Sequence, residues 1–158
     1  MKNVVLTRID DRLIHGQVVT GWVKKTECSR ILVVDDQVAK DPFMQRLLKA
    51  AAPPKMLVEA KSTADASKWL LEEEEAGERI LILVKVPETV EDLQKAGLVF
   101  DEVILGGMAA KAGRKKFNKN VSASEEEVAC MRRIMEKGTR MVFQLVPDET
   151  PVDVAKLV

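Results

Sequence analysis

The sequence predicts a single α/β domain, residues 1–158, built on an open, twisted and mainly parallel β-sheet with helices on both faces. Three observations support this fold class. Short runs of β-branched residues alternate with amphipathic stretches, which is typical of a parallel sheet with right-handed crossovers. Residues 80–84 (ILILV) are apolar on both faces, as a central parallel strand requires. The chain is 158 residues long and 46% apolar, which suits one full hydrophobic core.

Runs rich in apolar and β-branched residues predict six strands, at residues 3–9, 30–36, 55–60, 79–86, 101–107 and 139–147. Amphipathic stretches predict five helices between them and a short terminal helix, at residues 16–25, 40–53, 62–77, 87–97, 122–138 and 149–158. The first helix is amphipathic because Val18, Val19, Trp22 and Val23 fall on one face, which we expect to pack on the sheet.

Capping signals mark the ends of the next two helices. Asp41 is placed as an N-cap, Pro42 follows at the first helical position, and Pro53 closes the helix. Ser62 is the expected cap of the third helix, which we expect to end near Gly77.

The last long helix also has clear boundaries. Ser124 and Glu127 have the spacing of a capping box, and Gly138 is the expected stop. Before this helix, residues 106–121 are basic, contain glycine and show no clear period. They predict a long connection with a short strand near Val121.

Composition excludes several classes of function. The 25 basic and 25 acidic side chains balance, so the chain has no broad electrostatic attraction to nucleic acid. No phosphate-binding GxxxxGK[ST] or GxGxxG motif follows the first strand, so no nucleotide cofactor is expected. One histidine, His15, and two distant cysteines, Cys28 and Cys130, cannot form a closed zinc site, so no metal is expected either.

The sequence also predicts a cytoplasmic location. The longest apolar run, residues 80–84, is far shorter than the ~20 residues of a membrane span, so no direct insertion into a membrane is expected. The first residues, MKNVVLTRIDDR, turn polar too early for a signal peptide. Cys28 and Cys130 are interpreted as reduced, structural thiols.

The loop after the first strand is the candidate site, because ligands of open α/β sheets bind outside the carboxyl ends of the strands. His15 lies there, at the start of a helix, where the positive end of the helix dipole disfavours an imidazolium and favours an anion. A neutral imidazole is a nucleophile, so His15 could accept a phosphoryl group. Arg12 could neutralise its oxygens, Asp10 could orient the ring, and the amides of Gly16 and Gln17 could bind it.

Other charged residues at the same edge leave alternatives open. Lys85 follows the fourth strand and could contact phosphate or a partner, although a solvated lysine is the default. Arg8 could be structural and pair with Asp10 or Asp11. Asp35 and Asp36 end the second strand; they could bind a cation, as in phospho-acceptor receiver domains, or cap a turn, which we favour.

The segment RIDDRLIHGQVVTGW, residues 8–22, resembles the signature of the IIB component of the mannose/fructose/sorbose family of the bacterial phosphoenolpyruvate-dependent sugar phosphotransferase system. Weaker blocks are similar in the same order: VVDDQVAKDPFMQRLLKAAAPP (33–54), LVKVPE (83–88), LGGM (105–108) and KGTRMVFQLVP (137–147). The resemblance covers almost the whole chain. The chain differs at PPK (53–55) and in the unusually basic KAGRKKFNK segment (111–119).

The resemblance implies a cytoplasmic phosphocarrier, an enzyme of the phosphotransferase class. The family histidine, at His15, takes a phosphoryl group on Nδ1 from a phosphohistidine of the IIA component. It then passes the group to a sugar bound by the membrane IIC/IID permease, with which the carrier associates peripherally. Arg12 is implied to steady the phosphoryl group. The implied sheet order is 3-2-1-4 followed by the later strands, with the reversal between strands 1 and 4 beside His15.

Two other functions remain open on the sequence. One is a non-catalytic regulatory domain whose His15 is phosphorylated only as a signal. The other is a metal-dependent receiver that uses Asp35 and Asp36. For the carrier, the candidate docking cations are the basic side chains near the expected site, namely Lys85, Arg114, Lys115 and Lys116.

Overall fold

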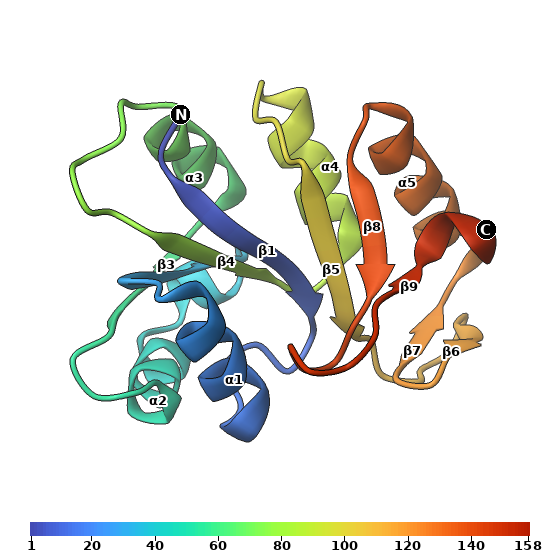
Figure 1. Cartoon of the computed structure of the whole chain (residues 1–158), viewed down its shortest axis with the longest axis horizontal. Helices are drawn as coiled ribbons and strands as arrows, with labels where there is room; N and C mark the ends of the chain where they lie inside the picture. Colours follow the sequence, from blue (N-terminus) through green and yellow to red (C-terminus); the bar gives the residue numbers. More distant parts are fainter.

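The computed structural model contains a central seven-stranded sheet (Figure 1). It describes the backbone of residues 1–158 and the side chains of all of them except Gln17 and Val18. The sheet consists of β1 (Val4–Asp10), β2 (Arg30–Val34), β3 (Leu57–Lys61), β4 (Ile80–Val84), β5 (Glu102–Gly107), β8 (Arg140–Phe143) and β9 (Val152–Asp153). All neighbouring strands are parallel except β9, which is antiparallel to β8. The mainly parallel α/β sheet predicted from the sequence is therefore confirmed.

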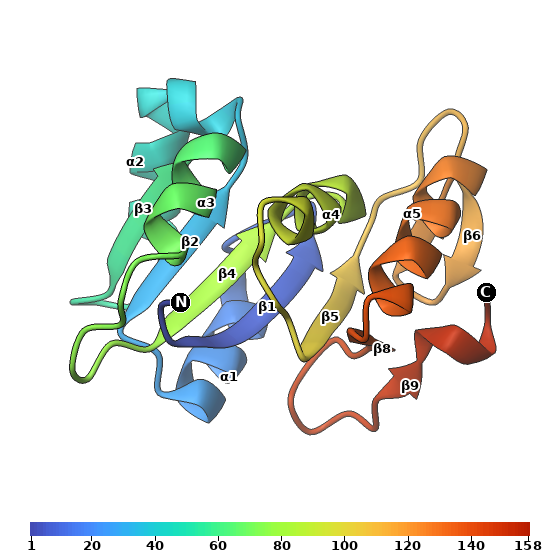
Figure 2. The same cartoon turned by 90° about the horizontal axis from the view of Figure 1, so that it is seen from above.

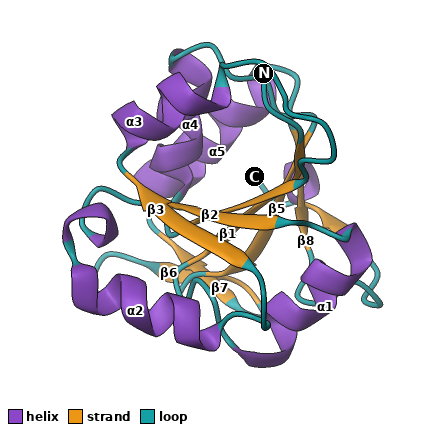
Figure 3. Cartoon of the chain, turned by 90° about the vertical axis from the view of Figure 1, so that its left-hand side faces the viewer, coloured by secondary structure: helices purple, strands orange, loops and turns teal.

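Helices cover both faces of this sheet (Figure 3). They are α1 (Gly16–Thr26), α2 (Pro42–Ala51), α3 (Thr63–Leu70), α4 (Pro87–Lys95) and α5 (Glu125–Glu136). Helices α1 and α2 lie on one face, and α3, α4 and α5 lie on the other. Two apolar cores result, one on each face of the sheet, and β4 contributes side chains to both. Ile80 and Ile82 face one core, and Leu81 and Leu83 face the other. None of the helices in the described part of the chain is long and apolar enough to cross a membrane.

The strand order differs from the predicted 3-2-1-4. The observed order is β3-β2-β4-β1-β5-β8-β9, so β4 lies between β2 and β1 (Figure 2). The order follows from strand pairing that no local signal encodes, because β4 pairs with β2 on one side and with β1 on the other. All five residues of β4 are buried and apolar, and Arg8 and Asp10 of β1 are buried as well. Both strands are therefore interior, and burial alone does not distinguish the two orders.

The switch point nevertheless lies where the site was expected. Strands β1 and β4 are neighbours, and the chain leaves them for helices on opposite faces, α1 and α4. A crevice outside the carboxyl ends of such a strand pair is the usual binding site of a doubly wound sheet.

Most predicted caps are confirmed. The side chain of Asp41 accepts a hydrogen bond from the N–H of Met44 at the start of α2, and Ser62 caps α3. Ser124 and Glu127 form the complete capping box of α5. Between Asp35 and α2 the chain adds one unpredicted 3₁₀ turn, Val38–Lys40.

The third helix is shorter than predicted, ending at Leu70 instead of near Gly77. The carbonyl of Leu70 accepts a hydrogen bond from the N–H of Lys2 (2.8 Å), which belongs to the N-terminal segment. The buried ammonium of Lys2 also lies 3.7 Å from carboxylate oxygens of Glu75 and Glu78. A tertiary contact that local sequence does not encode therefore holds the acidic residues 72–75 (EEEE) in a loop after Leu70.

Two further segments differ from the prediction. The connection predicted at residues 106–121 ends in a hairpin of β6 (Lys115–Asn118) and β7 (Val121–Ala123) instead of one short strand. The C-terminal segment forms β9 and one 3₁₀ turn, Val154–Lys156, instead of a helix from residue 149. β9 pairs with β8, and the side chain of Asp153 accepts from the N–H of Ala155, so the helical turn begins only there.

Candidate functional site

The loop from β1 to α1 carries the candidate site. The N–H of Leu13 donates to the carbonyl of Asp10 (2.9 Å), which closes a tight turn with Leu13 at a left-handed φ of 56°. A leucine is uncommon in that region, and burial of Leu13 and Ile14 in the core below α1 holds it there. These two anchors leave the side chains of Arg12 and His15 partly exposed, 48% and 25% respectively.

The carboxylate of Asp10 is the centre of the site and is fully buried. Its Oδ1 accepts from the backbone N–H of Arg12 (3.1 Å) and from Nε of Arg12 (3.0 Å). Its Oδ2 accepts from Nη2 of Arg12 (3.0 Å) and Nη2 of Arg8 (3.2 Å), and it lies 3.2 Å from Nε2 of His15. Burial alone would raise the pKa of Asp10, but the hydrogen bonds from Arg12, the charge of Arg8 and the contact with His15 together lower it.

This arrangement assigns the tautomer of His15. An ionised carboxylate only accepts hydrogen bonds, so the Nε2 of His15 that faces Asp10 must be the donor. In a neutral imidazole the other nitrogen, Nδ1, then carries the free electron pair. The imidazole is thus oriented as a nucleophile through Nδ1.

His15 also begins α1. It is the N-cap residue in extended conformation (φ −148°, ψ 126°), and its side chain makes no capping hydrogen bond. Gly16 follows with φ 38°, and a Cβ added to it would meet nothing within 4 Å, so open space adjoins the helix start. The side chain of Gln17 lies outside the described residues. The predicted contact between its backbone N–H and an anion stays a prediction.

Arg12 is held beside the imidazole by their common partner. Its guanidinium donates twice to Asp10, and these hydrogen bonds raise the pKa of Arg12. The predicted trio of Asp10, Arg12 and His15 is therefore brought together. The guanidinium does not point freely outward, however, because two of its donors are already used by the carboxylate.

Arg8 contributes a second arginine that the sequence left undecided. It pairs with Asp10, and its Nη1 donates to the backbone carbonyl of Gln144 (2.7 Å). Its side chain is 1% exposed and lies over the ring of Trp22, 5.6 Å from the centroid. The sequence did not indicate Gln144 and Gly106 as neighbours of the site. Gly106 lies in the LGGM block, but only the fold shows that its lack of a side chain makes room for the guanidinium of Arg8.

The second aspartate of the loop, Asp11, joins the site to the β6–β7 region. Its Oδ2 accepts from the N–H of Ala109 (2.7 Å) and lies 3.5 Å from Nη1 of Arg114. Arg114 also binds both carboxylate oxygens of Glu127 (2.9 and 2.8 Å). Its side chain is only 3% exposed, so the prediction of Arg114 as a docking cation is wrong. Two carboxylates and a carbonyl hold it inside, whereas Lys115 and Lys116 are exposed.

The remaining candidates divide clearly. Lys85 follows the end of β4, next to β1, and is half-buried; among the described residues it has no ion pair or hydrogen bond. Asp35 accepts from the N–H groups of Gln37 (3.0 Å) and Val38 (2.9 Å). Asp36 accepts from the N–H of Thr63 (2.8 Å). Asp35 therefore caps a turn, as favoured, whereas Asp36 accepts from the first residue of α3, 27 positions along the chain.

No group of three or more metal-ligating side chains occurs among the residues described by the structure. Cys28 and Cys130 are free and buried, and burial raises the pKa of the Cys130 thiol to about 12. Such a thiol is inert as a nucleophile at neutral pH.

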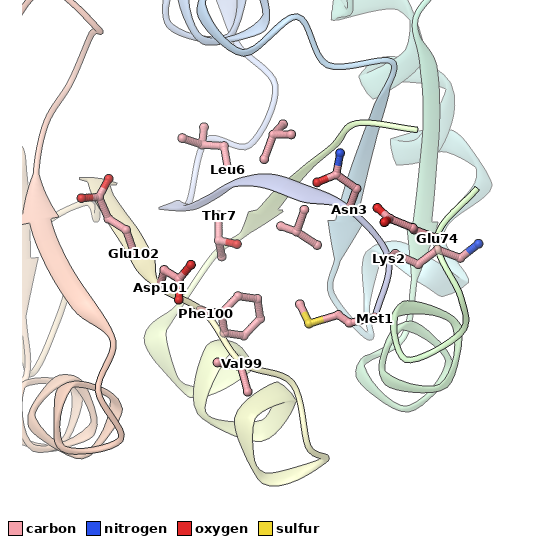
Figure 4. Close-up of a pocket in the computed structure, with 12 residues that line it drawn as sticks. Met1, Lys2, Asn3, Leu6, Thr7, Glu74, Val99, Phe100, Asp101 and Glu102 are labelled. Carbon is pink, nitrogen blue, oxygen red and sulfur yellow. The ribbon is translucent and has the colours of Figure 1, made fainter. Parts of the chain in front are cut away.

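A hollow of about 380 Å³ lies at the other edge of the sheet (Figure 4). Met1, Lys2, Val99, Phe100 and the amino-terminal half of β1 line it. Because His15 follows the carboxyl end of the same strand, this hollow is separate from the candidate site.

The fold and the site define a class: a doubly wound α/β domain that presents an oriented imidazole, in place of a glycine-rich phosphate loop, at its switch point. The family model described as "PTS system sorbose subfamily IIB component" matches residues 4–158. The chain therefore belongs to the IIB components of the mannose/fructose/sorbose family of the phosphotransferase system.

Individual relatives agree with this assignment. The mannose-specific EIIAB component of Escherichia coli K12 is 35% identical over 153 residues, 97% of this chain but 47% of the relative, so the chain spans about half the length of the curated relatives of this kind. The sorbose-specific EIIB component of Lacticaseibacillus casei is 34% identical over 151 residues, 96% of this chain and 92% of the relative. The crystal structure of the IIBSor domain of the sorbose permease from Klebsiella pneumoniae has a TM-score of 0.92 and 31% identity, covering 98% of this chain and 94% of that one.

Proposed function

We propose that the protein is a phosphocarrier in sugar uptake, and that His15 carries the phosphoryl group. The observation that supports this most is the contact between Nε2 of His15 and the buried carboxylate of Asp10 (3.2 Å). It leaves Nδ1 as the nucleophile on an imidazole that is 25% exposed, next to open space at the start of α1.

The first transfer joins Nδ1 of His15 to phosphorus. The electron pair of Nδ1 attacks the phosphoryl group of a phosphohistidine on the IIA component, the P–N bond of the donor breaks, and the donor imidazole leaves with that electron pair. Arg12 and the first amides of α1, at Gly16 and Gln17, stabilise the equatorial oxygens. Phosphoryl transfer needs mostly in-line positioning and charge stabilisation, and these groups can supply both without a metal.

The second transfer hands the group to sugar at the membrane IIC/IID permease. A sugar hydroxyl attacks phosphorus, the bond from Nδ1 to phosphorus breaks, and a base of the permease takes the hydroxyl proton. This reaction makes the protein a protein-phosphohistidine–sugar phosphotransferase. It places the carrier in the cytoplasm, peripherally associated with the permease.

Docking requires a surface around His15 that fits both partners in turn. Lys115 and Lys116 are exposed on β6, and Lys85 lies at the same edge of the sheet as His15. We expect these lysines to accelerate encounter with an acidic face of IIA. The transfer rate should then fall as salt is raised, and a flat salt dependence would remove them from the interface.

The experiment that tests the carrier is phosphorylation by phosphorylated IIA. Wild type should form a phosphoprotein that is lost in acid and survives in base, and His15→Ala should form none while its circular dichroism stays unchanged. Phosphate on His15→Ala would refute the assignment. Phosphate that is labile in base would instead indicate an acyl phosphate, as in a receiver, which the hydrogen bonds of Asp35 and Asp36 to backbone N–H groups disfavour.

The regulatory alternative uses the same acceptor and needs a separate test. Phosphorylated protein is mixed with membrane vesicles containing the IIC/IID permease and a sugar. A carrier loses its phosphate to the sugar as sugar phosphate, whereas a regulator keeps it.

A further inference from the structure

The buried guanidinium of Arg8 is unusual in its energetics. The side chain is 1% exposed, and Nε has no hydrogen-bond partner among the described residues. Burying a charge carries a large desolvation penalty, and a well-packed apolar residue is often at least as stable in its place. Stability alone therefore does not account for Arg8.

Four separate segments hold this guanidinium in one place. Its own strand is β1, and Nη1 donates to the carbonyl of Gln144 in the segment after β8 (2.7 Å). Trp22 of α1 covers it, and the indole Nε1 of Trp22 is itself fixed by the carbonyl of Leu145 (2.9 Å). On the β5 side a Cβ at Gly106 would lie 2.0 Å from Nη2 and 2.2 Å from Cζ, so only glycine leaves room.

We infer that Arg8 is a positioning residue: it fixes the Asp10 carboxylate so that the proton of His15 stays on Nε2 and Nδ1 stays open for the phosphoryl group. Nη2 of Arg8 donates to Oδ2 of Asp10, the same oxygen that faces His15. The consequence for phosphoryl transfer rests on the proposed function, but the tautomer of His15 is a property of the unphosphorylated protein.

Arg12 cannot serve as the permanent support of the carboxylate. Its side chain is 48% exposed, and the proposed mechanism requires its guanidinium to turn toward phosphoryl oxygens. When Arg12 does so, Asp10 loses two of its hydrogen bonds. Arg8 is enclosed on all sides and stays bound to Asp10. Arg8 therefore supports the carboxylate permanently, while Arg12 is able to turn toward the phosphoryl group.

Arg8 also balances charge around the imidazole. The groups that face the Asp10 carboxylate are Arg8, Arg12 and His15; Glu149 acts on Arg8 from the segment after β8. The guanidinium of Arg8 compensates the buried charge of Asp10, so the carboxylate that orients the ring keeps a counterion when Arg12 turns away.

The test uses the fact that His15 is the only histidine of the chain. Its ring nitrogens can be assigned without ambiguity in ¹⁵N-edited NMR spectra of the unphosphorylated protein. Three variants are compared with wild type. Arg8→Met removes the charge, Gly106→Ala displaces the guanidinium but keeps its charge, and Arg30→Met is the matched control. Arg30 pairs with Glu59 and lies over Trp69 (5.1 Å), but it begins β2 at the opposite edge of the sheet.

Wild type and Arg30→Met should show the Nε2–H tautomer alone. Arg8→Met and Gly106→Ala should both show the Nδ1–H tautomer as well, and phosphoryl acceptance should fall about tenfold, the usual scale for loss of an orienting partner. Should Arg8→Met fail to fold, Gly106→Ala decides, because it retains every charge.

Folded Arg8→Met or Gly106→Ala with the wild-type tautomer would overturn the inference and leave Arg8 as packing alone. Failure of the proposed function has a different signature: the tautomer responds to the variants, but wild type accepts no phosphoryl group from IIA.

Discussion

Two aspartate pairs lie at the carboxyl ends of strands in the same sheet, and they behave differently. Asp10 ends β1 and Asp11 follows it, while Asp35 and Asp36 follow β2, at the same edge. The first pair faces basic side chains: Asp10 contacts Arg8, Arg12 and His15, and Asp11 lies beside Arg114. Among the described residues, the second pair accepts hydrogen bonds from backbone N–H groups alone, those of residues 37, 38 and 63.

This difference shows that an aspartate at the carboxyl end of a strand is not by itself part of a functional site; its hydrogen-bond partners decide that. Oδ1 of Asp35 caps a local turn and Oδ1 of Asp36 accepts from the first residue of α3, so these carboxylates shape the chain. Asp10 has oxygens committed to groups that can move or change protonation, so it can influence chemistry. Substitutions in the two pairs should therefore have opposite signatures, one in transfer and one in stability.

The largest expected effect belongs to Asp10→Asn. The amide cannot accept from two guanidinium groups and His15 as the carboxylate does, so the tautomer of His15 is released. We expect phosphoryl transfer from IIA to fall about 100-fold, measured at a temperature where the variant is folded. The variant should also be less stable, because Arg8 keeps a buried charge without its counterion. The matched variant Asp36→Asn should transfer at the wild-type rate.

The next effect belongs to Arg12→Lys. A lysine keeps the charge but cannot donate to Asp10 and to a phosphoryl group through one planar fork. Transfer should slow about tenfold, while the folded structure should remain. A wild-type rate in this variant would show that the guanidinium geometry has no part in the reaction.

Asp35→Ala should act on stability alone. Its carboxylate satisfies two N–H groups at the start of a 3₁₀ turn, and loss of such a cap costs about 1 kcal/mol in the free energy of unfolding. Urea unfolding measures this cost. The rate of phosphoryl transfer should be unchanged, and a slower rate would mean that the second pair also belongs to the site.

Low pH should remove the contribution of Asp10 to the free energy of unfolding. Burial alone would raise its pKa, but the hydrogen bonds from Arg12, the charge of Arg8 and the contact with His15 together lower it from the ordinary value of 3.8. The folded pKa is below the unfolded one, so the stabilisation is complete above about pH 5 and is lost as pH falls through the lowered pKa. The difference in unfolding free energy between wild type and Asp10→Asn should therefore shrink below about pH 4. A constant difference would contradict this assignment.

Sequence alone predicted the sheet, the helix caps and the trio of Asp10, Arg12 and His15, because local signals encode them. Caps depend on residues three or four apart, and the trio lies within six residues of one loop. The strand order, by contrast, depends on pairing between strands far apart in the sequence, and the order implied by the resemblance placed β4 wrongly.

Long-range contacts explain the other errors. Helix α3 ends early because Lys2 reaches the carbonyl of Leu70, and β9 forms because β8 offers an edge. Arg114 looked like a surface cation, yet Asp11 and Glu127, remote in sequence, bury it. The fit of Arg8 against Gly106 is also a long-range contact, and the local sequence around neither residue predicts it.

The most direct test of the whole account is the isomer of phosphohistidine formed on wild-type protein. ¹⁵N-edited NMR of the phosphorylated chain distinguishes phosphate on Nδ1 from phosphate on Nε2 at its single histidine. An Asp10 carboxylate that holds Nε2–H predicts phosphate on Nδ1 only. Phosphate on Nε2 would require the ring to leave Asp10 before it reacts, and would contradict the account.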